Sequence, residues 1–228
     1  MIPWQLLDSA QVPGDGGELR LYQRGKEFSI RADRSELMNS SAHGSEDALA
    51  EFACEKITTR LRPCILIGGL GMGYTLAATL HLLGAGSRVV IAELVPAVVR
   101  WNRGPLAPLA GHPLQDRRVI VRETDVADIL REERGAYHAI VLDVDNGPEG
   151  LTRNANDWLY SQAGLQAAFA ALRTGGMLVV WSAHPDRAFN RRLRQCGFSV
   201  DERSVRARGS RGGAHHTIWI ATRVERHS

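Results

Sequence analysis

The sequence predicts an α/β protein whose sheet is mostly parallel and ends in an antiparallel strand. After Pro63, short apolar runs alternate with segments of helical periodicity, which is typical of a parallel sheet covered by helices on both faces. The last two predicted strands, 198–205 and 216–222, follow one another without an intervening helix and therefore form an antiparallel hairpin. A second β-hairpin is predicted at the N-terminus, within residues 18–41.

The N-terminal hairpin is predicted from two alternating runs, 19–22 and 28–31, which are joined by a glycine-containing turn. Beyond it the periodicity becomes helical. We therefore expect an N-terminal β-hairpin extension, residues 1–44, followed by a main domain, residues 45–228.

The main domain begins with a helix near Ser45, where Glu46 and Asp47 lie in the first turn and complement the helix dipole. A strand, a turn and a helix then repeat along the chain. The seven predicted strands are 64–67, 88–92, 119–121, 139–142, 177–181, 198–205 and 216–222. The predicted helices between them are 75–83, 96–103, 126–134, 163–173 and 188–195.

Composition excludes few classes of function. The net charge is +3 without a long basic tract, so a nucleic acid is not a required partner and we expect none. The three cysteines lack the spacing of a zinc site, and we expect no bound metal. The N-terminus lacks a signal-peptide pattern, and no apolar run approaches the ~20 residues that span a bilayer. We therefore expect a cytoplasmic protein without membrane contact.

A glycine-rich turn, residues 68–73, follows the first strand of the parallel sheet. Glycines at this position let the backbone approach a ligand closely and leave helix N-terminal amides available to it. Gly69, Gly71 and Gly73 form G-x-G-x-G, whereas Tyr74 stands where the dinucleotide fingerprint requires glycine. This pattern is similar to the first motif of class I S-adenosylmethionine-dependent enzymes, and it predicts that these three glycines bind an adenosyl cofactor.

Two acidic residues at strand ends favour the same prediction of an adenosyl cofactor. Glu93 ends the second strand about 20 residues beyond the turn, where a carboxylate accepts hydrogen bonds from ribose hydroxyls. Asp125 follows the third strand, where class I enzymes resemble one another in binding the adenine amino group. The alternatives are that Glu93 is a solvated strand-end acid and that Asp125 only caps the following helix.

The fourth strand ends in Asp143, and Asp145 follows two residues later. Ligands of open α/β sheets bind beyond the carboxyl ends of the strands, so these acids are expected to face the reacting end of the cofactor. A sulfonium carbon is already electrophilic, and a carboxylate in hydrogen-bond reach would orient and deprotonate the nucleophile. We therefore predict Asp143 and Asp145 as catalytic residues. Asp145 has the alternative of shaping an Asx turn.

The segment that begins at Asp143 resembles the spermidine synthase family, as does the segment 151–176 that leads to the fifth strand. The resemblance covers roughly residues 18–183 and implies a Rossmann-like methyltransferase fold. It also implies that Asp143 binds both the cofactor and the attacking amine. Leu70 and Met72 differ from the family's glycine turn, which is usually three consecutive glycines with an acid inside.

The resemblance also implies three substrate-binding residues. Glu36 lies in a partial match to the family's Tyr-x-Glu-Met segment, and Tyr160 matches the position of a family tyrosine. His43 lies where the hairpin meets the first helix, close to where a substrate lid would lie. A structural or exposed role is the alternative for His43.

These observations predict a transferase that uses S-adenosylmethionine, or its decarboxylated form, to alkylate a small-molecule nucleophile, with an amine as one option. Because the polyamine motifs are incomplete, we expect methyl transfer ahead of aminopropyl transfer. An RNA or protein methyltransferase is an alternative suggested by the arginines of the last hairpin, 203–211. A non-catalytic adenosyl-binding module is another. The family resemblance suggests a homodimer.

Overall fold

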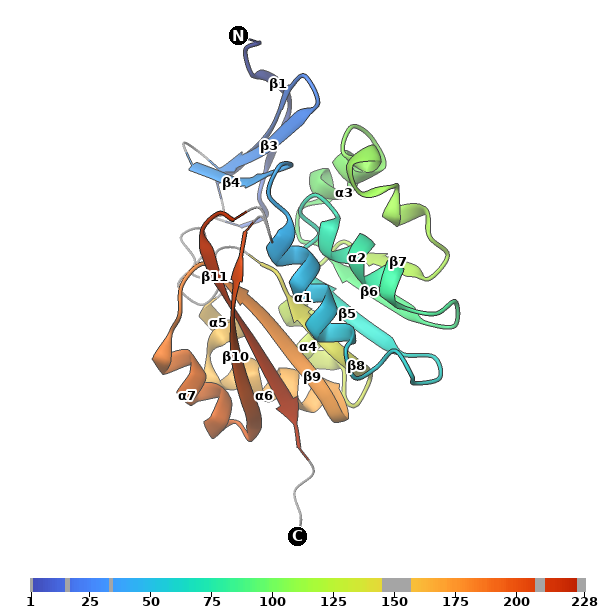
Figure 1. Cartoon of the computed structure of the whole chain (residues 1–228), viewed down its shortest axis with the longest axis vertical. Coiled ribbons are helices and arrows are strands. Elements are labelled where there is room, and N and C mark those ends of the chain that lie inside the picture. The colour runs from blue at the N-terminus through green and yellow to red at the C-terminus, as the bar shows by residue number, and fades with distance from the viewer. Residues whose placement is uncertain (1, 15–16, 33–34, 145–156, 208–211, 225–228) are drawn as a thin grey trace.

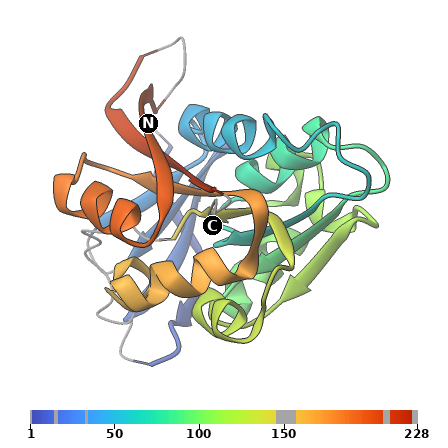
Figure 2. The same ribbon diagram turned by 90° about the horizontal axis from the view of Figure 1, so that it is seen from below.

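The computed structural model describes residues 2–14, 17–32, 35–144, 157–207 and 212–224 (Figure 1). The described chain forms two sheets. A four-stranded antiparallel sheet made of N-terminal residues lies at one end of a seven-stranded sheet, and helices cover both faces of the larger sheet (Figure 1; Figure 2).

The large sheet has one antiparallel strand among parallel ones. In spatial order its strands are β10 (Phe198–Arg206), β11 (His215–Arg223), β9 (Leu172–Ser182), β8 (Tyr137–Leu142), β5 (Cys64–Gly68), β6 (Arg88–Ala92) and β7 (Val119–Arg122). Strands β5 to β9 pair in parallel, and β11 runs antiparallel to both of its neighbours. The predicted seven-stranded sheet with an antiparallel last strand is therefore confirmed.

The helices divide between the two faces of this sheet. They are α1 (Gly44–Cys54), α2 (Tyr74–Leu82), α3 (Pro96–Arg103), α4 (Val126–Glu132), α5 (Asp157–Tyr160), α6 (Gln162–Ala171) and α7 (Arg187–Gln195), with the short 3₁₀ helices η1 (Ala107–Ala110) and η2 (Pro113–Gln115). Alternate residues of a strand face opposite sides, so Ile65 and Ile67 pack with α1, α2 and α3, whereas Leu66 packs with α4, α6 and α7. This two-sided burial produces the continuous apolar runs that predicted the sheet.

Local sequence explains where several helices begin. Pro96 occupies the first turn of α3, where its missing N–H has no intrahelical partner to lose. The Asp125 carboxylate accepts a hydrogen bond from the Ala127 N–H at 2.8 Å and caps α4. Asp186 caps α7 in the same way. Both β6 and α3 have the bounds predicted from the sequence.

The small sheet extends the predicted hairpin by one strand on each side. Its strands, in spatial order, are β1 (Gln5–Gln11), β2 (Glu18–Arg24), β3 (Glu27–Ala32) and β4 (Ser35–Asn39). The predicted hairpin is β2 and β3. Strand β1 was not predicted because it is mostly exposed and lacks alternation, and β4 is only five residues long. Leu21, Phe28 and Ile30 share one hydrophobic cluster with α1, so the small sheet packs on the main domain.

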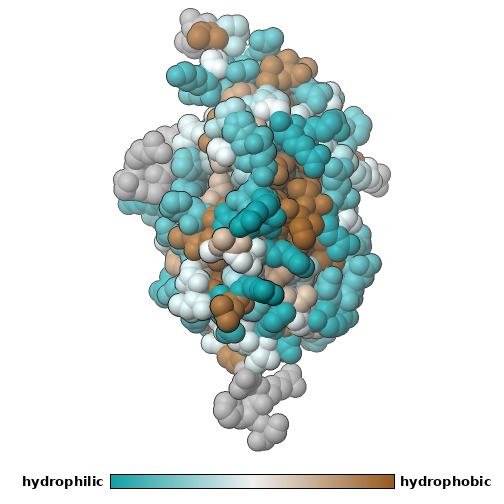
Figure 3. All heavy atoms as spheres, turned by 90° about the vertical axis from the view of Figure 1, so that its right-hand side faces the viewer, coloured by the Kyte–Doolittle hydropathy of each residue, from teal (hydrophilic) through white to brown (hydrophobic). Residues whose placement is uncertain are grey.

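The outer surface is mostly polar on the side that carries α3. Figure 3 shows this side: hydrophilic residues cover most of it, and hydrophobic residues gather along its middle and near the N-terminal sheet. Across the described part of the chain, none of the helices has the length and apolarity needed to cross a bilayer.

Candidate active site

A cavity of about 440 Å³ lies beyond the carboxyl ends of the parallel strands. Strand β5 lies between β6 and β8, and the chain leaves β5 toward α2 on one face of the sheet but leaves β8 toward α6 on the other. Such a switch point is where open α/β sheets bind ligands. The N-terminal sheet forms the opposite wall of the cavity through Leu19, Ile30 and Met38.

The glycine-rich turn brings the end of β5 against the end of β8. The Asp143 N–H donates to the Gly68 carbonyl at 3.0 Å, and the Gly69 N–H donates to the Ala92 carbonyl at 2.9 Å. Gly69 has a φ of +90°, and a Cβ at this position would overlap the carbonyl oxygen of Asp143. Glycine is therefore required here for both backbone conformation and space.

Two polar side chains hold the turn and the start of α2. The Asn102 side chain, which is 1% exposed, donates to the carbonyls of Gly71 at 2.8 Å and Val98 at 3.0 Å. The Thr75 hydroxyl, in the first turn of α2, donates to Oδ2 of Asp143 at 2.8 Å. Sequence reasoning found neither residue, because the contacts of Asn102 with Gly71 and of Thr75 with Asp143 join positions far apart in the chain.

Glu93 faces the cavity from the end of β6. Its Oε2 accepts from the Leu70 N–H at 2.9 Å and its Oε1 accepts from the Val95 N–H at 2.8 Å, so backbone amides on both sides fix the carboxylate. An ionised carboxylate has about four acceptor positions, so it also suits a pair of ribose hydroxyls. Ribose binding by Glu93 stays a prediction.

Asp125 caps a helix and also lines the cavity. Its Oδ1 caps α4, and the residue also lines the cavity beside Val126. Leu94, Val95 and Val126 supply apolar surface on this side of the cavity. Adenine binding by Asp125 stays a prediction.

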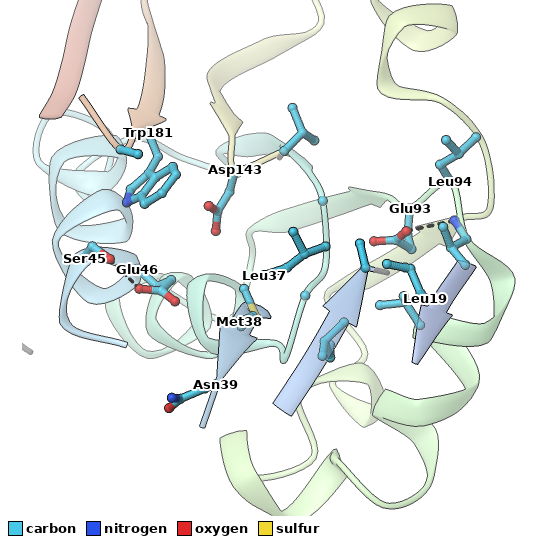
Figure 4. Close-up of a pocket in the computed structure, with 18 of the residues that line it drawn as sticks. Leu19, Leu37, Met38, Asn39, Ser45, Glu46, Glu93, Leu94, Asp143 and Trp181 are labelled. Atoms are coloured by element: carbon cyan, nitrogen blue, oxygen red, sulfur yellow. Dashed lines mark hydrogen bonds between the residues drawn. The ribbon is translucent and has the colours of Figure 1, made fainter. Parts of the chain in front are cut away.

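Asp143 points into the middle of the cavity (Figure 4). Burial raises the pKa of its carboxyl, while the hydrogen bond from the Thr75 hydroxyl opposes the shift. A carboxylate whose pKa is raised in this way is a better proton acceptor than one in water. Figure 4 shows Glu93 and Leu94 on one side of Asp143, and Trp181 and Glu46 on the other.

Glu46 is an acid of the cavity that sequence reasoning did not assign to the site. It is 8% exposed, lines the cavity, and accepts a hydrogen bond at Oε2 from the Ser45 hydroxyl at 2.6 Å. Burial, together with the negative charge of Asp143, raises the pKa of Glu46 to about 7. The only signal in the sequence was an acid at the junction of hairpin and helix, which the helix dipole explained equally well.

The cavity is acidic. Five carboxylate residues line it: Glu36, Glu46, Glu93, Asp125 and Asp143. Within the described ranges of the chain, no Lys or Arg lines it, and His216 is its one basic residue. Burial lowers the pKa of His216, which favours the neutral imidazole. The site is therefore suited to a ligand that carries positive charge.

The remaining predicted residues lie at different distances from the cavity. Glu36 lines it and accepts from the Ser29 hydroxyl at 2.7 Å. His43 lies outside the lining, where its Nδ1 is 2.9 Å from Oδ2 of Asp47 and its ring stacks on Tyr74. Gly73 caps α2, and Gly69 and Gly71 line the cavity. Substrate binding by Glu36 and His43 stays a prediction.

Tyr160 lies next to a residue of the cavity lining, and Asp145 is not among the described residues. Tyr160 is 3% exposed, and its hydroxyl donates to the carbonyl of Val144, a cavity residue, at 3.2 Å. Its structural position is thus behind the wall, and a direct role in substrate binding stays a prediction. Asp145 lies outside the described residues.

The residues of the cavity fit an adenosyl group with a positively charged sulfur. Gly69 and Gly71 line the cavity without side chains, the acids at the ends of β6 and β7 suit ribose and adenine, and the carboxylates of Glu46 and Asp143 would offset a positive charge.

No protein-family model and no curated protein matches the sequence. Solved structures, however, are similar to this chain in fold. Spermidine synthase from Thermotoga maritima is 16% identical with a TM-score of 0.76, over 96% of this chain and 72% of that chain. A spermidine synthase in complex with the transition state analogue AdoDATO is also 16% identical, with a TM-score of 0.75 and the same coverage.

A third similar structure is a probable spermidine synthase from Corynebacterium glutamicum, 13% identical with a TM-score of 0.69, over 98% of this chain and 81% of that chain. At these identities the likeness establishes the fold. The chain has the Rossmann-like methyltransferase fold in the form found in spermidine synthases, and the resemblance predicted from the sequence is confirmed at that level.

Replacing Gly69 by Ala should destabilise the protein by about 2–4 kcal/mol, because the new Cβ would meet the Asp143 carbonyl at a left-handed backbone position. Urea unfolding measures this change. Gly84→Ala is the matched control, because nothing lies within 4 Å of a Cβ there. Equal stability losses in the two variants would contradict the proposed close approach of β5 and β8.

Replacing Glu46 by Gln should remove a pH-dependent loss of stability. The pKa of Glu46 is about 7 in the folded protein and 4.5 for an ordinary glutamate, so the unfolded chain ionises first as pH rises. Stability from this group is complete below about pH 4.5 and is lost as pH passes 7. At pH 8, Glu46→Gln should exceed the wild type by up to about 3 kcal/mol, with little difference at pH 4.5.

Urea unfolding of the wild type and Glu46→Gln at a series of pH values checks this expectation. Asp47→Asn removes the neighbouring carboxylate, which does not line the cavity, and should keep the wild-type pH trend. Parallel pH profiles for Glu46→Gln and the wild type would show that the Glu46 carboxyl has no raised pKa.

Proposed function

We propose that this chain is a transferase that moves an aminopropyl group from decarboxylated S-adenosylmethionine to an amine. The observation that carries the proposal is the charge of the cavity: five carboxylate residues line it, and none of the lining residues described is a Lys or Arg. Like charges at short range are unfavourable in a partly buried site. The carboxylate of S-adenosylmethionine would meet such charges, whereas the decarboxylated form has no carboxylate.

The comparisons favour aminopropyl transfer over the methyl transfer expected from the sequence. The similar solved structures are named as spermidine synthases, and one of them holds a transition state analogue. The acidic cavity also disfavours RNA methylation, because a phosphodiester backbone would be repelled. The incomplete polyamine motifs around Leu70 and Met72 thus carry less weight than the charge of the whole site.

In this proposal the residues on either side of Asp143 have separate tasks. Glu93 and Asp125 hold the ribose and the adenine, and the glycine turn accommodates the chain of atoms between them and the sulfur. The bound donor supplies an electrophilic carbon next to a positively charged sulfur. Alignment of the acceptor with that carbon then accounts for much of the acceleration.

Asp143 orients and deprotonates the acceptor amine. The Thr75 hydroxyl donates to Oδ2 at 2.8 Å and fixes the carboxylate plane. The carboxylate can thus accept the proton that the nitrogen loses when it bonds to carbon and the carbon–sulfur bond breaks with its electron pair moving to sulfur. Burial, which raises the pKa of Asp143, makes this proton transfer more favourable.

The wild type should bind decarboxylated S-adenosylmethionine at least about 10-fold more tightly than S-adenosylmethionine, a difference of about 1.4 kcal/mol. The physical reason is repulsion between the cavity acids and the additional carboxylate. Isothermal titration calorimetry measures both affinities, and chromatography of reactions with putrescine detects methylthioadenosine. Tighter binding of S-adenosylmethionine, with methyl transfer to the amine, would overturn the assignment.

Asp143→Asn should lower kcat/KM by about 100-fold to 10,000-fold, because the amide cannot accept the proton. Affinity for methylthioadenosine, which has no ammonium group, should stay within about 3-fold, since the amide oxygen still accepts from Thr75. Asp128→Asn is the control: this acid lies on α4, is about half exposed and pairs with Arg131. Wild-type turnover by Asp143→Asn would remove Asp143 from the chemistry.

A further inference from the structure

Two acidic residues occupy the first turn of α1, and only one of them lines the cavity. Glu46 is 8% exposed and lines the cavity. Asp47 lies outside the lining, with 47% of its side chain exposed and its Oδ2 2.9 Å from Nδ1 of His43. One acid in the first turn already complements the helix dipole, so this effect does not explain why Glu46 is buried.

Burial of the Glu46 carboxyl is unfavourable in the protein alone. It forms no ion pair with any residue that the structure describes, and its hydrogen bond comes from the neutral Ser45 hydroxyl. A buried carboxylate without a cation costs several kcal/mol or becomes protonated. The negative charge of Asp143 adds to this effect and contributes to the raised pKa of Glu46. A cation between the two carboxylates would offset both effects.

The place of Glu46 along the cavity indicates what kind of cation it would meet. Figure 4 shows Glu93 on one side of Asp143, and Glu46 and Trp181 on the other. If Glu93 holds the ribose and the reacting carbon lies near Asp143, Glu46 lies beyond that carbon. Trp181 provides apolar wall there, which suits methylene groups.

A metal ion fits these surroundings less well. In the part of the chain that the structure describes, no group of three or more His, Cys, Asp or Glu residues is arranged to hold a metal. An ammonium group on an alkyl chain, in contrast, uses both features of this end of the cavity. Its charge meets the carboxylates and its methylenes meet the apolar wall.

We propose that Glu46, together with Asp143, binds a primary alkylammonium group, and that Glu46 is a specificity-determining residue of this site. The inference rests on the proposed function and deepens it. The alkylammonium has two sources: the aminopropyl chain of the donor and the amine of the acceptor. Both sources carry the same primary ammonium group, and separate binding measurements distinguish them.

The test compares Glu46→Gln, Asp47→Asn and the wild type by isothermal titration calorimetry at pH 8. The probes are decarboxylated S-adenosylmethionine, methylthioadenosine, which lacks the aminopropyl ammonium, and putrescine added to the methylthioadenosine complex. Glu46→Gln keeps the size of the side chain and should stay folded, as far-ultraviolet circular dichroism would verify. Asp47→Asn is the matched control, one position along the same helix.

Glu46→Gln should weaken at least one ammonium-bearing probe by about 30-fold or more, because it removes one partner of a buried charge pair. Methylthioadenosine should bind all three proteins within about 2-fold. Weakening of the decarboxylated donor assigns the ammonium to the donor, and weakening of putrescine assigns it to the acceptor. Asp47→Asn should match the wild type for every probe.

Failure of this inference differs from failure of the proposed function. If the wild type binds ammonium-bearing probes and Glu46→Gln binds them equally well, the role of Glu46 is wrong while aminopropyl transfer stands. If the wild type binds decarboxylated S-adenosylmethionine no more tightly than methylthioadenosine, and its methylthioadenosine complex does not bind putrescine, the role of Glu46 and the proposed function are both wrong. In turnover assays, Glu46→Gln should raise the KM of the affected substrate more than it lowers kcat, in contrast to Asp143→Asn.

Discussion

The close approach of β5 and β8 is the constraint on which the rest of the site depends. The Asp143 N–H bonds to the Gly68 carbonyl, and Gly69 has no side chain, so the two strand ends lie directly against each other. This contact sets the direction in which the Asp143 carboxylate leaves β8 and brings it within 2.8 Å of the Thr75 hydroxyl at the start of α2. The glycine turn thus positions the Asp143 carboxylate at the cavity.

Charge is the second organising property, and it acts against stability in the protein alone. Glu46 and Asp143 are both held where burial raises their pKa values, and no described basic side chain other than His216 shares the cavity. Such an arrangement is unfavourable until positive charge arrives. A sulfonium donor and an amine supply that charge, so the same electrostatic property that strains the unliganded protein selects its substrates in our proposal.

Fold and function rest on different kinds of observation here. The solved structures establish a fold shared at 13 to 16% identity, and a fold of this type accommodates many reactions. The proposed reaction therefore depends on particular side chains: the acids that line the cavity, Thr75 behind Asp143, and Trp181 on the far wall. Leu70 and Met72, which differ from the family pattern, lie in a turn whose Gly69, Gly71 and Gly73 all have left-handed φ values.

The sequence by itself determined the alternation of strands and helices, including the bounds of β6 and α3, the antiparallel final strand, and the positions of Glu93, Asp125 and Asp143 at strand ends. These features follow from periodicity and from local spacing, which neighbouring residues define. Only the tertiary structure decided that Glu46 belongs to the cavity, because its burial depends on the packing of α1 against α2, β8 and β9, whose residues are distant in the chain. The exposed strand β1 also lacked a local signal, since an edge strand with little burial has no apolar alternation to detect.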